Sequence, residues 1–336
     1  MKIAMLAPIS WRTPPRHYGP WEWVVSMLTE GLVKKGINVT LYATGDSLTE
    51  AKLRSVALRP YSEDFELDPK VWECMHVASV FEDAKRYDLI HNNFDFLPLT
   101  YSGLVSTPLL TTIHGFSSPR IMPVYKKYNK KTYYVAISDS DRHPDLNYSA
   151  TIYHGIPVER YPYRENHKGY LLFFGRIHHD KGVFEAIQLA LKLKLPLVIA
   201  GIIQDQGYFD TKVVPYLDDD QIRYVGPVNQ EDKGKVLGGA SALLHLINFD
   251  EPFGLSVVEA MACGTPVIAF NRGSMAELIQ DGKTGFLVKD IDQAGDAVLK
   301  LSKLKRADCR QHVENKFGVE RMVEQYIKIY KKIIGS

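Results

Sequence analysis

The chain has 336 residues, of which 45% are hydrophobic and 24% are charged, and its formal net charge is +2. This length is generous for one α/β domain and comfortable for two, and the composition is that of an ordinary globular protein. The small net charge provides no field that would attract nucleic acid, so we expect no nucleic-acid partner. The cysteines stand far apart without CxxC spacing, which predicts neither a disulfide framework nor a zinc site and favours a reducing cytoplasm: Cys74, Cys263 and Cys309.

The N-terminal stretch MKIAMLAPISW is predicted to be a first strand. Its apolar run is short for a signal peptide and lacks a cleavage site. No stretch approaches the ~18 apolar residues needed to span a bilayer.

Short aliphatic runs alternate with longer amphipathic segments along the first half of the chain. Strands are predicted at KIAMLAPI, NVTLYAT, DLIHNN, PLLTTIHG and TYYVAIS. Between the first two, apolar residues recur at helical spacing, and Gly36 suits the end of that helix. Strands that are apolar nearly throughout are expected in a parallel sheet covered by helices on both faces.

A break near residues 157–168, PVERYPYRENHK, is predicted to be a linker because it has prolines, charges and no periodicity. The alternation then restarts with GYLLFFGR, PLVIAG, QIRYVG, ALLHLI, PVIAF and GFLV. The sequence therefore predicts two doubly wound Rossmann-like domains, residues 1–160 and 161–317. Residues 318–336 are predicted to form an amphipathic helix that can pack on either domain, with packing back on the N-terminal domain as our hypothesis. Ligands of such sheets bind beyond the carboxyl ends of the strands.

The stretch FFGRIHHDKG places Arg176 and Lys181 between a strand and the start of a helix. The helix dipole favours anions at that end, so two cations beside exposed N–H groups indicate an anion site. The alternative is a pair of solvated loop charges. The neighbouring His178 and His179 are interpreted as surface histidines, because adjacent side chains do not easily chelate one metal ion.

The stretch EPFGLSVVEAMACGTPVIAF carries Glu251 and Glu259 around a short predicted helix that ends near Ala262. Ser256 and Glu259 have the spacing of a capping box, so helix capping is one interpretation. Capping does not account for Glu251, which follows the strand ALLHLINF, nor for Gly254, where a ligand can approach the backbone. Two carboxylates with N–H donors between them also suit the hydroxyl groups of a sugar and a ribose.

The stretch EPFGLSVVEAMACGTPVIA resembles the signature of glycosyltransferase family 4, whose members are retaining enzymes of the GT-B fold. FFGR with the following KG, GSMAELIQDGKTGFLV, ISDSDR, HGIPVERY and IHG match as well, so the resemblance covers nearly the whole chain. It implies two Rossmann-like domains facing a central cleft, with the acceptor on the N-terminal side and the nucleotide-sugar donor on the C-terminal side.

The resemblance also implies roles for single residues. Arg176 and Lys181 match the residues that bind the donor diphosphate. Glu259 matches the glutamate that holds the ribose, and Glu251 matches the one that holds the transferred sugar. His114 matches a histidine at the sugar end of the cleft, although a strand-end histidine with an ordinary structural role is the alternative. Backbone N–H groups for the sugar or phosphate are expected at Phe253, Gly254 and Leu255.

The loop after the first strand departs from the family pattern. Members often have two adjacent glycines there, whereas this chain has Gly19 followed by Pro20, which has no N–H and is suited to start a helix. Gly19 is kept as a donor-site candidate. Tyr18, Trp21 and Trp23 are candidates for shaping the acceptor side, with burial as the alternative for one of them.

Two further stretches suggest other ligands. Asp218, Asp219 and Asp220 resemble an acidic metal motif, but they precede a strand at its amino end and are interpreted as a solvated turn. The resemblance implies no metal and no other cofactor. YKKYNKKTYY, residues 125–134, interleaves lysines with tyrosines, which suits anionic lipid, although a solvated helix end is the simpler interpretation.

We therefore predict a retaining, metal-independent hexosyltransferase that uses a UDP- or GDP-sugar. Its acceptor is a hydroxyl group of a carbohydrate, a lipid-linked molecule or a small molecule, and its location is the cytoplasm, with peripheral contact to the membrane as a separate hypothesis. The alternatives are a non-catalytic nucleotide-sugar binding or membrane-associated scaffold on the same fold, and a different reaction such as phosphorolysis or epimerisation. The sequence leaves the donor sugar, its base and the acceptor open.

Overall fold

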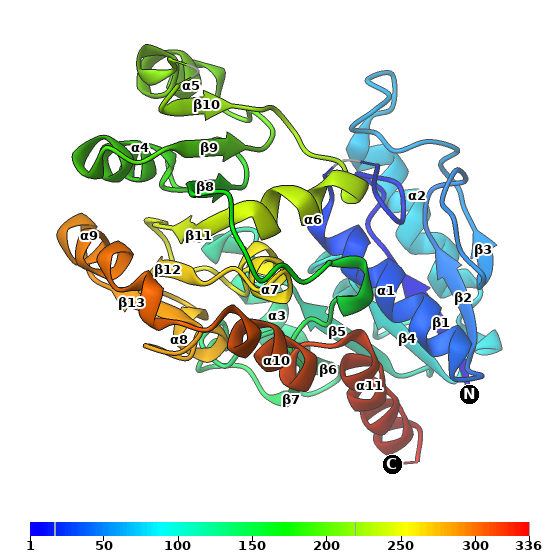
Figure 1. Cartoon of the computed structure of the whole chain (residues 1–336). Helices are drawn as coiled ribbons and strands as arrows, with labels where there is room; N and C mark the ends of the chain where they lie inside the picture. The colour runs from blue at the N-terminus through cyan, green and yellow to red at the C-terminus, as the bar shows by residue number, and fades with distance from the viewer. Residues whose placement is uncertain (17, 219, 336) are drawn as a thin grey trace. The chain divides into compact units, whose positions relative to one another are not determined.

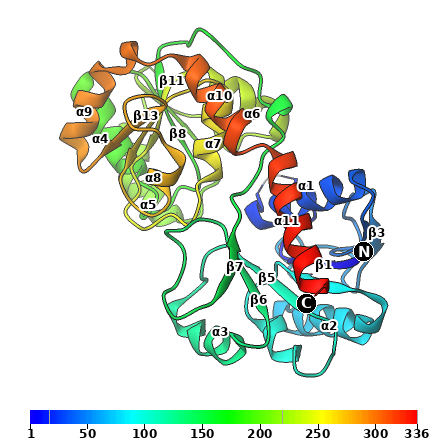
Figure 2. The same ribbon diagram turned by 90° about the horizontal axis from the view of Figure 1, so that it is seen from below.

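The computed structural model describes every residue except His17, Asp219 and Ser336. The chain divides into two compact units, residues 1–155 with 319–336, and residues 156–318. Each unit is an α/β fold around one parallel sheet (Figures 1 and 2).

The first unit contains a seven-stranded sheet with strand order β3-β2-β1-β4-β5-β6-β7, in which all pairs are parallel. Its strands are β1 (Lys2–Leu6), β2 (Asn38–Tyr42), β3 (Lys52–Arg54), β4 (Leu89–Asn92), β5 (Leu109–Ile113), β6 (Tyr133–Ala136) and β7 (Tyr148–Thr151). Its helices are α1 (Pro20–Lys34), α2 (Pro69–Glu82), α3 (Met122–Tyr128) and α11 (Val319–Ile334).

Successive side chains of β1 point to opposite faces of this sheet. Ala4 and Leu6 belong to a core cluster that also contains residues of α2 and α3. On the other face α11 lies beside α1, as both views of the ribbon show. There a Cβ on Gly31 of α1 would collide with Val323 of α11, so the two helices pack closely because residue 31 has no side chain.

A buried polar network fastens α11 to the first unit. His91 on β4 bonds through Nδ1 to the Tyr330 hydroxyl and through Nε2 to the Thr112 hydroxyl, both at 2.7 Å. The hydroxyl groups of Thr112 and Tyr326 are 2.8 Å apart. Both tyrosines belong to α11, so buried hydrogen bonds join the end of the chain to the middle of this sheet.

The second unit contains a six-stranded parallel sheet with strand order β10-β9-β8-β11-β12-β13. Its strands are β8 (Tyr170–Phe174), β9 (Leu197–Ala200), β10 (Ile222–Tyr224), β11 (Ala240–His245), β12 (Val267–Phe270) and β13 (Gly285–Val288). Its helices are α4 (Val183–Leu193), α5 (Gln206–Lys212), α6 (Gln230–Gly239), α7 (Leu255–Ala262), α8 (Met275–Leu278), α9 (Ile291–Leu299) and α10 (Arg306–Lys316).

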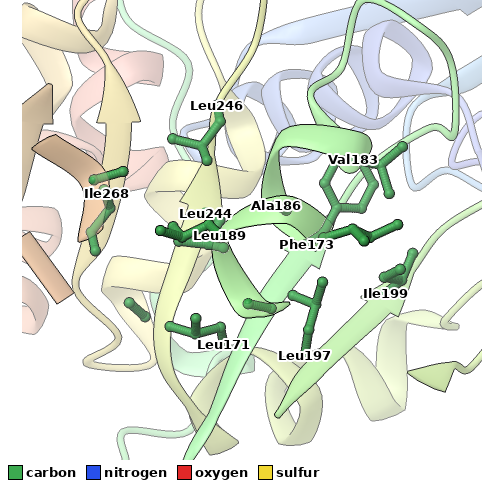
Figure 3. Packing of buried hydrophobic residues seen from close by; sticks show 14 of the residues in the cluster. Leu171, Phe173, Val183, Ala186, Leu189, Leu197, Ile199, Leu244, Leu246 and Ile268 are labelled. Atoms are coloured by element: carbon green, nitrogen blue, oxygen red, sulfur yellow. The ribbon is translucent and has the colours of Figure 1, made fainter. Parts of the chain in front are cut away.

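Aliphatic side chains of the central strands and of α4 make the core of the second unit. Figure 3 shows Leu171 and Phe173 of β8 pointing toward Ala186 and Leu189 of α4, with Leu244 of β11 beside them. In both sheets the paired strands are parallel, so the carboxyl ends of the strands lie at one edge of the sheet in each unit.

The stretch predicted to be a linker is packed against the second unit. Arg310 of α10 donates to the carbonyl oxygen of Tyr161 at 2.5 Å and to that of Ala262 at 2.9 Å. Arg306 donates through Nε to the carbonyl oxygen of Arg164 at 2.7 Å. These arginines fix the segment because they satisfy its backbone carbonyls, and proline content and charge alone do not reveal such partners.

Candidate functional site

The loop between β8 and α4 carries the two predicted cations. Arg176 follows the end of β8 and donates a hydrogen bond to Oε1 of Gln204. Lys181 directly precedes Gly182, the N-cap residue of α4. Gly182 has a φ of +76°, and a Cβ there would collide with the carbonyl oxygen of Leu246, so only glycine permits this close approach. The approach brings Lys181 to the carboxyl end of β11.

Lys181 and Glu251 form an ion pair in which Nζ lies 2.9 Å from Oε2, and each side chain is 15% exposed. Nε2 of His245 lies 3.7 Å from the same oxygen. Burial lowers the pKa of His245 to about 4, so this imidazole is neutral at pH 7 and Lys181 is the cation that faces Glu251. Nζ of Lys181 also lies 4.3 Å from the centre of the Phe249 ring.

The segment after β12 supports the loop that contains Glu251. The backbone N–H of Ser274 donates to the carbonyl oxygen of Glu251 at 3.0 Å, and its hydroxyl donates to the carbonyl oxygen of Phe253. Gly273 packs so closely on the backbone of Glu251 that a Cβ would collide with it. The sequence places these residues in GSMAEL, and the structure shows that this stretch positions the first glutamate.

The capping-box interpretation of Ser256 and Glu259 is wrong. α7 begins at Leu255, and the residue before it is Gly254, which has a left-handed backbone with φ 99°. Glycine has no side chain with which to cap a helix. Glu259 therefore lies in the second turn, too far along the helix to cap its start.

Glu259 is buried and is held by two donors. The Tyr161 hydroxyl donates to its Oε1 at 2.6 Å, and Nζ of Lys233 on α6 lies 2.9 Å from the same oxygen. The side chains of Lys233 and Glu259 are 12% and 4% exposed. Sequence reasoning missed both partners: Lys233 lies in a polar helix without a motif, and Tyr161 lies in HGIPVERY, which was quoted without a role for the tyrosine.

His114 lies just after β5 in the first unit and is fixed on several sides. Its Nε2 is 2.9 Å from Oδ1 of Asn93, and its Nδ1 is 3.4 Å from Nε2 of His154. The Trp21 ring stacks on it with centroids 5.4 Å apart and planes at 25°. Burial lowers the pKa of His114 to about 3, so a neutral imidazole is presented here.

The loop before α1 contains the weakest of the predicted site residues. Gly19 has a φ of 145° and precedes the helix, which begins at Pro20 as expected. Glu22, in the first turn of α1, is buried and accepts a hydrogen bond from the Trp11 N–H at 3.2 Å. Burial raises the pKa of Glu22 to about 7. Trp23 is buried, which agrees with the structural alternative for one of the aromatic residues.

The acidic stretch before β10 is occupied by backbone hydrogen bonds. Oδ1 of Asp218 accepts from the N–H groups of Asp220, Gln221 and Ile222 at 3.2, 2.8 and 2.8 Å. Asp219 lies outside the described residues. Asp218 therefore has the turn role that its position predicts.

The lysine–tyrosine stretch has a mixed role. Tyr125 and Tyr134 are fully buried, and the Tyr125 hydroxyl donates to Oδ1 of Asp95 at 2.6 Å. Lys126 pairs with Asp145 at 2.5 Å across an exposed surface. Tyr125 and Tyr134 are thus core residues, and the lysines of this stretch are exposed.

Residues 159–316 match the profile of the family described as "Glycosyl transferases group 1". The matched range includes Arg176, Lys181, Glu251 and Glu259. Within the described residues no helix is long and apolar enough to cross a membrane.

The curated relatives of this chain include a glycosyltransferase and two synthases. Over 98% of each chain the protein is 24% identical to an uncharacterized glycosyltransferase of Methanocaldococcus jannaschii. It is 32% identical to glycogen synthase of Mycobacterium tuberculosis over 45% of this chain and 39% of that protein. It is 33% identical to N-acetyl-alpha-D-glucosaminyl L-malate synthase of Bacillus anthracis over 34% of this chain and 32% of that protein. The last two matches span well under half of those proteins.

Solved structures share the whole fold. Sucrose-phosphate synthase from Thermosynechococcus elongatus has a TM-score of 0.82 at 18% identity, with 100% of this chain and 99% of that chain covered. Anabaena HepE in complex with UDP-glucose has a TM-score of 0.75 at 18% identity, with 99% and 100% covered. This chain thus has the GT-B fold.

The fold and the matched domain define the class of protein. The chain is a glycosyltransferase of the group 1 type, an enzyme that transfers a sugar from a nucleotide sugar. The resemblance to glycosyltransferase family 4 is confirmed at this level.

Proposed function

We propose that this enzyme transfers a hexose from a UDP- or GDP-sugar to a hydroxyl group with retention of the anomeric configuration and without a metal ion. The observation that carries the proposal is the pair of buried lysine–glutamate contacts, Lys181 with Glu251 and Lys233 with Glu259, in one unit. A donor with phosphates and hydroxyl groups needs cations and carboxylates close together, and this unit holds both.

Arg176 and Lys181 are proposed to bind the diphosphate. Charge grows on the departing phosphate oxygen as the glycosidic bond breaks, and fixed cations stabilise that charge in the transition state. In this proposal the acceptor attacks from the face that the diphosphate leaves, and the departing oxygen helps to take the acceptor proton. Asp218 is engaged by backbone N–H groups, which supports a reaction without metal at that stretch.

The two glutamates are proposed to contact different parts of the donor. Lys181 leaves Glu251 for the diphosphate, and Glu251 then accepts from hydroxyl groups of the transferred sugar. Tyr161 and Lys233 both engage Oε1 of Glu259, so we assign contact with the ribose hydroxyls to Oε2. N–H groups of Phe253, Gly254 and Leu255 complete the donor site in this proposal.

His114 and Gly19 are the proposed contributions of the first unit. The pKa of His114 is lowered by burial, so it would meet a sugar as a neutral hydrogen-bonding group rather than as a cation. Trp21 holds the ring by stacking. We propose a carbohydrate, lipid-linked or small-molecule acceptor on this side, and a cytoplasmic location, since all three cysteines are free thiols.

The experiment is a thermal-shift panel of UDP, GDP, ADP and their sugars in the presence of EDTA. UDP-glucose is the first probe, because a structural neighbour is a complex with UDP-glucose. Ligand at 100 times its dissociation constant stabilises a protein by about 2.7 kcal/mol, so a clear rise in Tm is expected for the donor and its diphosphate. A panel in which no nucleotide raises the Tm, or in which the shift needs Mn²⁺ or Mg²⁺, contradicts the proposal.

A further inference from the structure

His178, His179 and Asp205 gather on two neighbouring loops of the second unit. Each offers one ligand atom, and these atoms all lie within 4.8 Å of one another. The histidines belong to the loop between β8 and α4, and Asp205 belongs to the loop between β9 and α5. The two imidazole rings lie side by side, with centroids 4.1 Å apart, although the sequence analysis interpreted these adjacent histidines as surface residues that do not easily chelate one metal ion.

Backbone hydrogen bonds join the two loops. Ile177 and Ile203 form a parallel bridge beyond the paired strands. The Ile177 N–H donates to the carbonyl oxygen of Ile202 at 2.8 Å, and the Ile177 carbonyl oxygen accepts from Gln204 and Asp205 at 3.2 Å. These backbone bonds hold the histidines and Asp205 near one another.

Neighbouring groups orient two of the three side chains. Nδ1 of His178 bonds to Oδ1 of Asp180 at 2.6 Å, which leaves Nε2 as the ring nitrogen for a metal ion. A carboxylate that accepts from one nitrogen of an imidazole is the usual support of a metal-binding histidine. Oδ1 of Asp205 caps α5 by accepting from the Tyr208 N–H at 2.9 Å, and its Oδ2 lies 3.9 Å from Nδ1 of His179.

We propose that His178, His179 and Asp205 bind one divalent transition-metal ion of the zinc type. Two imidazoles and one carboxylate are a ligand set that Zn²⁺ favours, and a tetrahedral ion needs its ligands about 3.4 Å apart. The His179 side chain is 67% exposed and rotates without breaking the core, so it closes the remaining gap. The ion would join the loop of Arg176 to the loop before α5 and keep a coordination position open.

The test is calorimetric titration of the untagged protein with Zn²⁺ in a buffer that does not chelate metal, and absorption spectroscopy with Co²⁺. Saturable binding of one ion per chain is expected, with a tetrahedral Co²⁺ spectrum and a higher Tm. The affinity should fall at least tenfold in His179→Ala and in Asp205→Asn. The asparagine oxygen still caps α5, so the second variant separates loss of a ligand from damage to the helix.

His167→Ala is the matched control, because His167 is an exposed histidine outside the cluster. It should bind Zn²⁺ as the wild type does. Unchanged affinity in both His179→Ala and Asp205→Asn overturns the proposal, and so does the lack of a saturable one-ion phase. The result is independent of the proposed sugar transfer, since the ion alone is titrated.

Discussion

The side chains of the proposed donor site are paired with one another before any ligand binds. Lys181 faces Glu251 and Lys233 faces Glu259, each at 2.9 Å and largely buried. A buried cation without a partner is costly, so each pair stabilises the charges that this unit buries, and in the proposed function the donor replaces these partners.

Arg176→Ala and Lys181→Ala should lower kcat while the fold is kept. Loss of one donor that stabilises transition-state charge typically costs ~10²–10³ in rate. Steady-state kinetics with the true donor measure this, and unchanged circular dichroism shows that the fold is intact. Lys235→Ala is a suitable control, since Lys235 is an exposed lysine that pairs with Asp232 on the surface. Near wild-type turnover in both site variants would place the diphosphate elsewhere.

Sequence reasoning selected candidate residues that stand in recognisable motifs, and it missed the side chains that contact them in the folded protein. Arg176, Lys181, Glu251 and Glu259 stand in contiguous stretches whose spacing carries information. Tyr161 and Lys233 meet Glu259 only because the segment before β8 and helix α6 come together in space. The capping alternative failed for a local reason, because α7 begins one residue before Ser256 rather than after it.

At the scale of elements, strands with an apolar run were predictable, and the two edge strands of the first sheet, which lack such a run, were not. All six strands of the second unit and five of the first were expected from aliphatic runs. β3, with sequence KLR, and β7, with sequence YSAT, were missed. Both lie at sheet edges and are only partly buried, so they lack the continuous apolar run that marks a central strand.

Helix α3 and the loop after it carry the lysines proposed to contact anionic lipid. Lys126, Lys127, Lys130 and Lys131 are all exposed. If they meet a membrane, co-sedimentation should require anionic vesicles and should fall as salt is raised. A Lys127→Glu, Lys130→Glu double variant should lose binding, and it leaves the Lys126–Asp145 pair intact. Equal sedimentation with neutral and anionic vesicles would exclude the contact.

At the scale of the whole molecule, buried histidines make the fold sensitive to acid. Burial lowers the pKa to about 3 or 4, or well below the usual value, for His76, His91, His114, His154 and His245. Each is neutral in the folded state and protonated in the unfolded state below pH ~6.5. As the pH falls below ~6.5, the free energy of unfolding therefore decreases by about 1.4 kcal/mol per pH unit for each of these histidines.

Protonation of Glu22 changes the free energy of unfolding in the opposite direction. Its pKa is raised to about 7, so it favours the folded state below pH ~4.5, and this contribution is lost as the pH rises through 7. Unfolding at pH 5 should therefore take up protons, because the five histidines gain more protons than Glu22 releases. Calorimetric scans between pH 7.5 and 5 should show a falling Tm, and a constant Tm over that range would contradict the assignment of neutral buried histidines.

The most direct measurement is calorimetric titration of Glu251→Gln and Glu259→Gln with a nucleotide diphosphate and with its sugar. Glu259→Gln should weaken both ligands tenfold or more, because both carry the ribose and a charge-assisted hydrogen bond contributes roughly 1.5–3 kcal/mol. Glu251→Gln should leave the bare diphosphate nearly unchanged and weaken the nucleotide sugar. Tyr161→Phe keeps the carboxylate and removes one support, so a smaller loss on both ligands is expected. Equal weakening of both ligands by Glu251→Gln, or no weakening by Glu259→Gln, would contradict the division of the donor between the two glutamates.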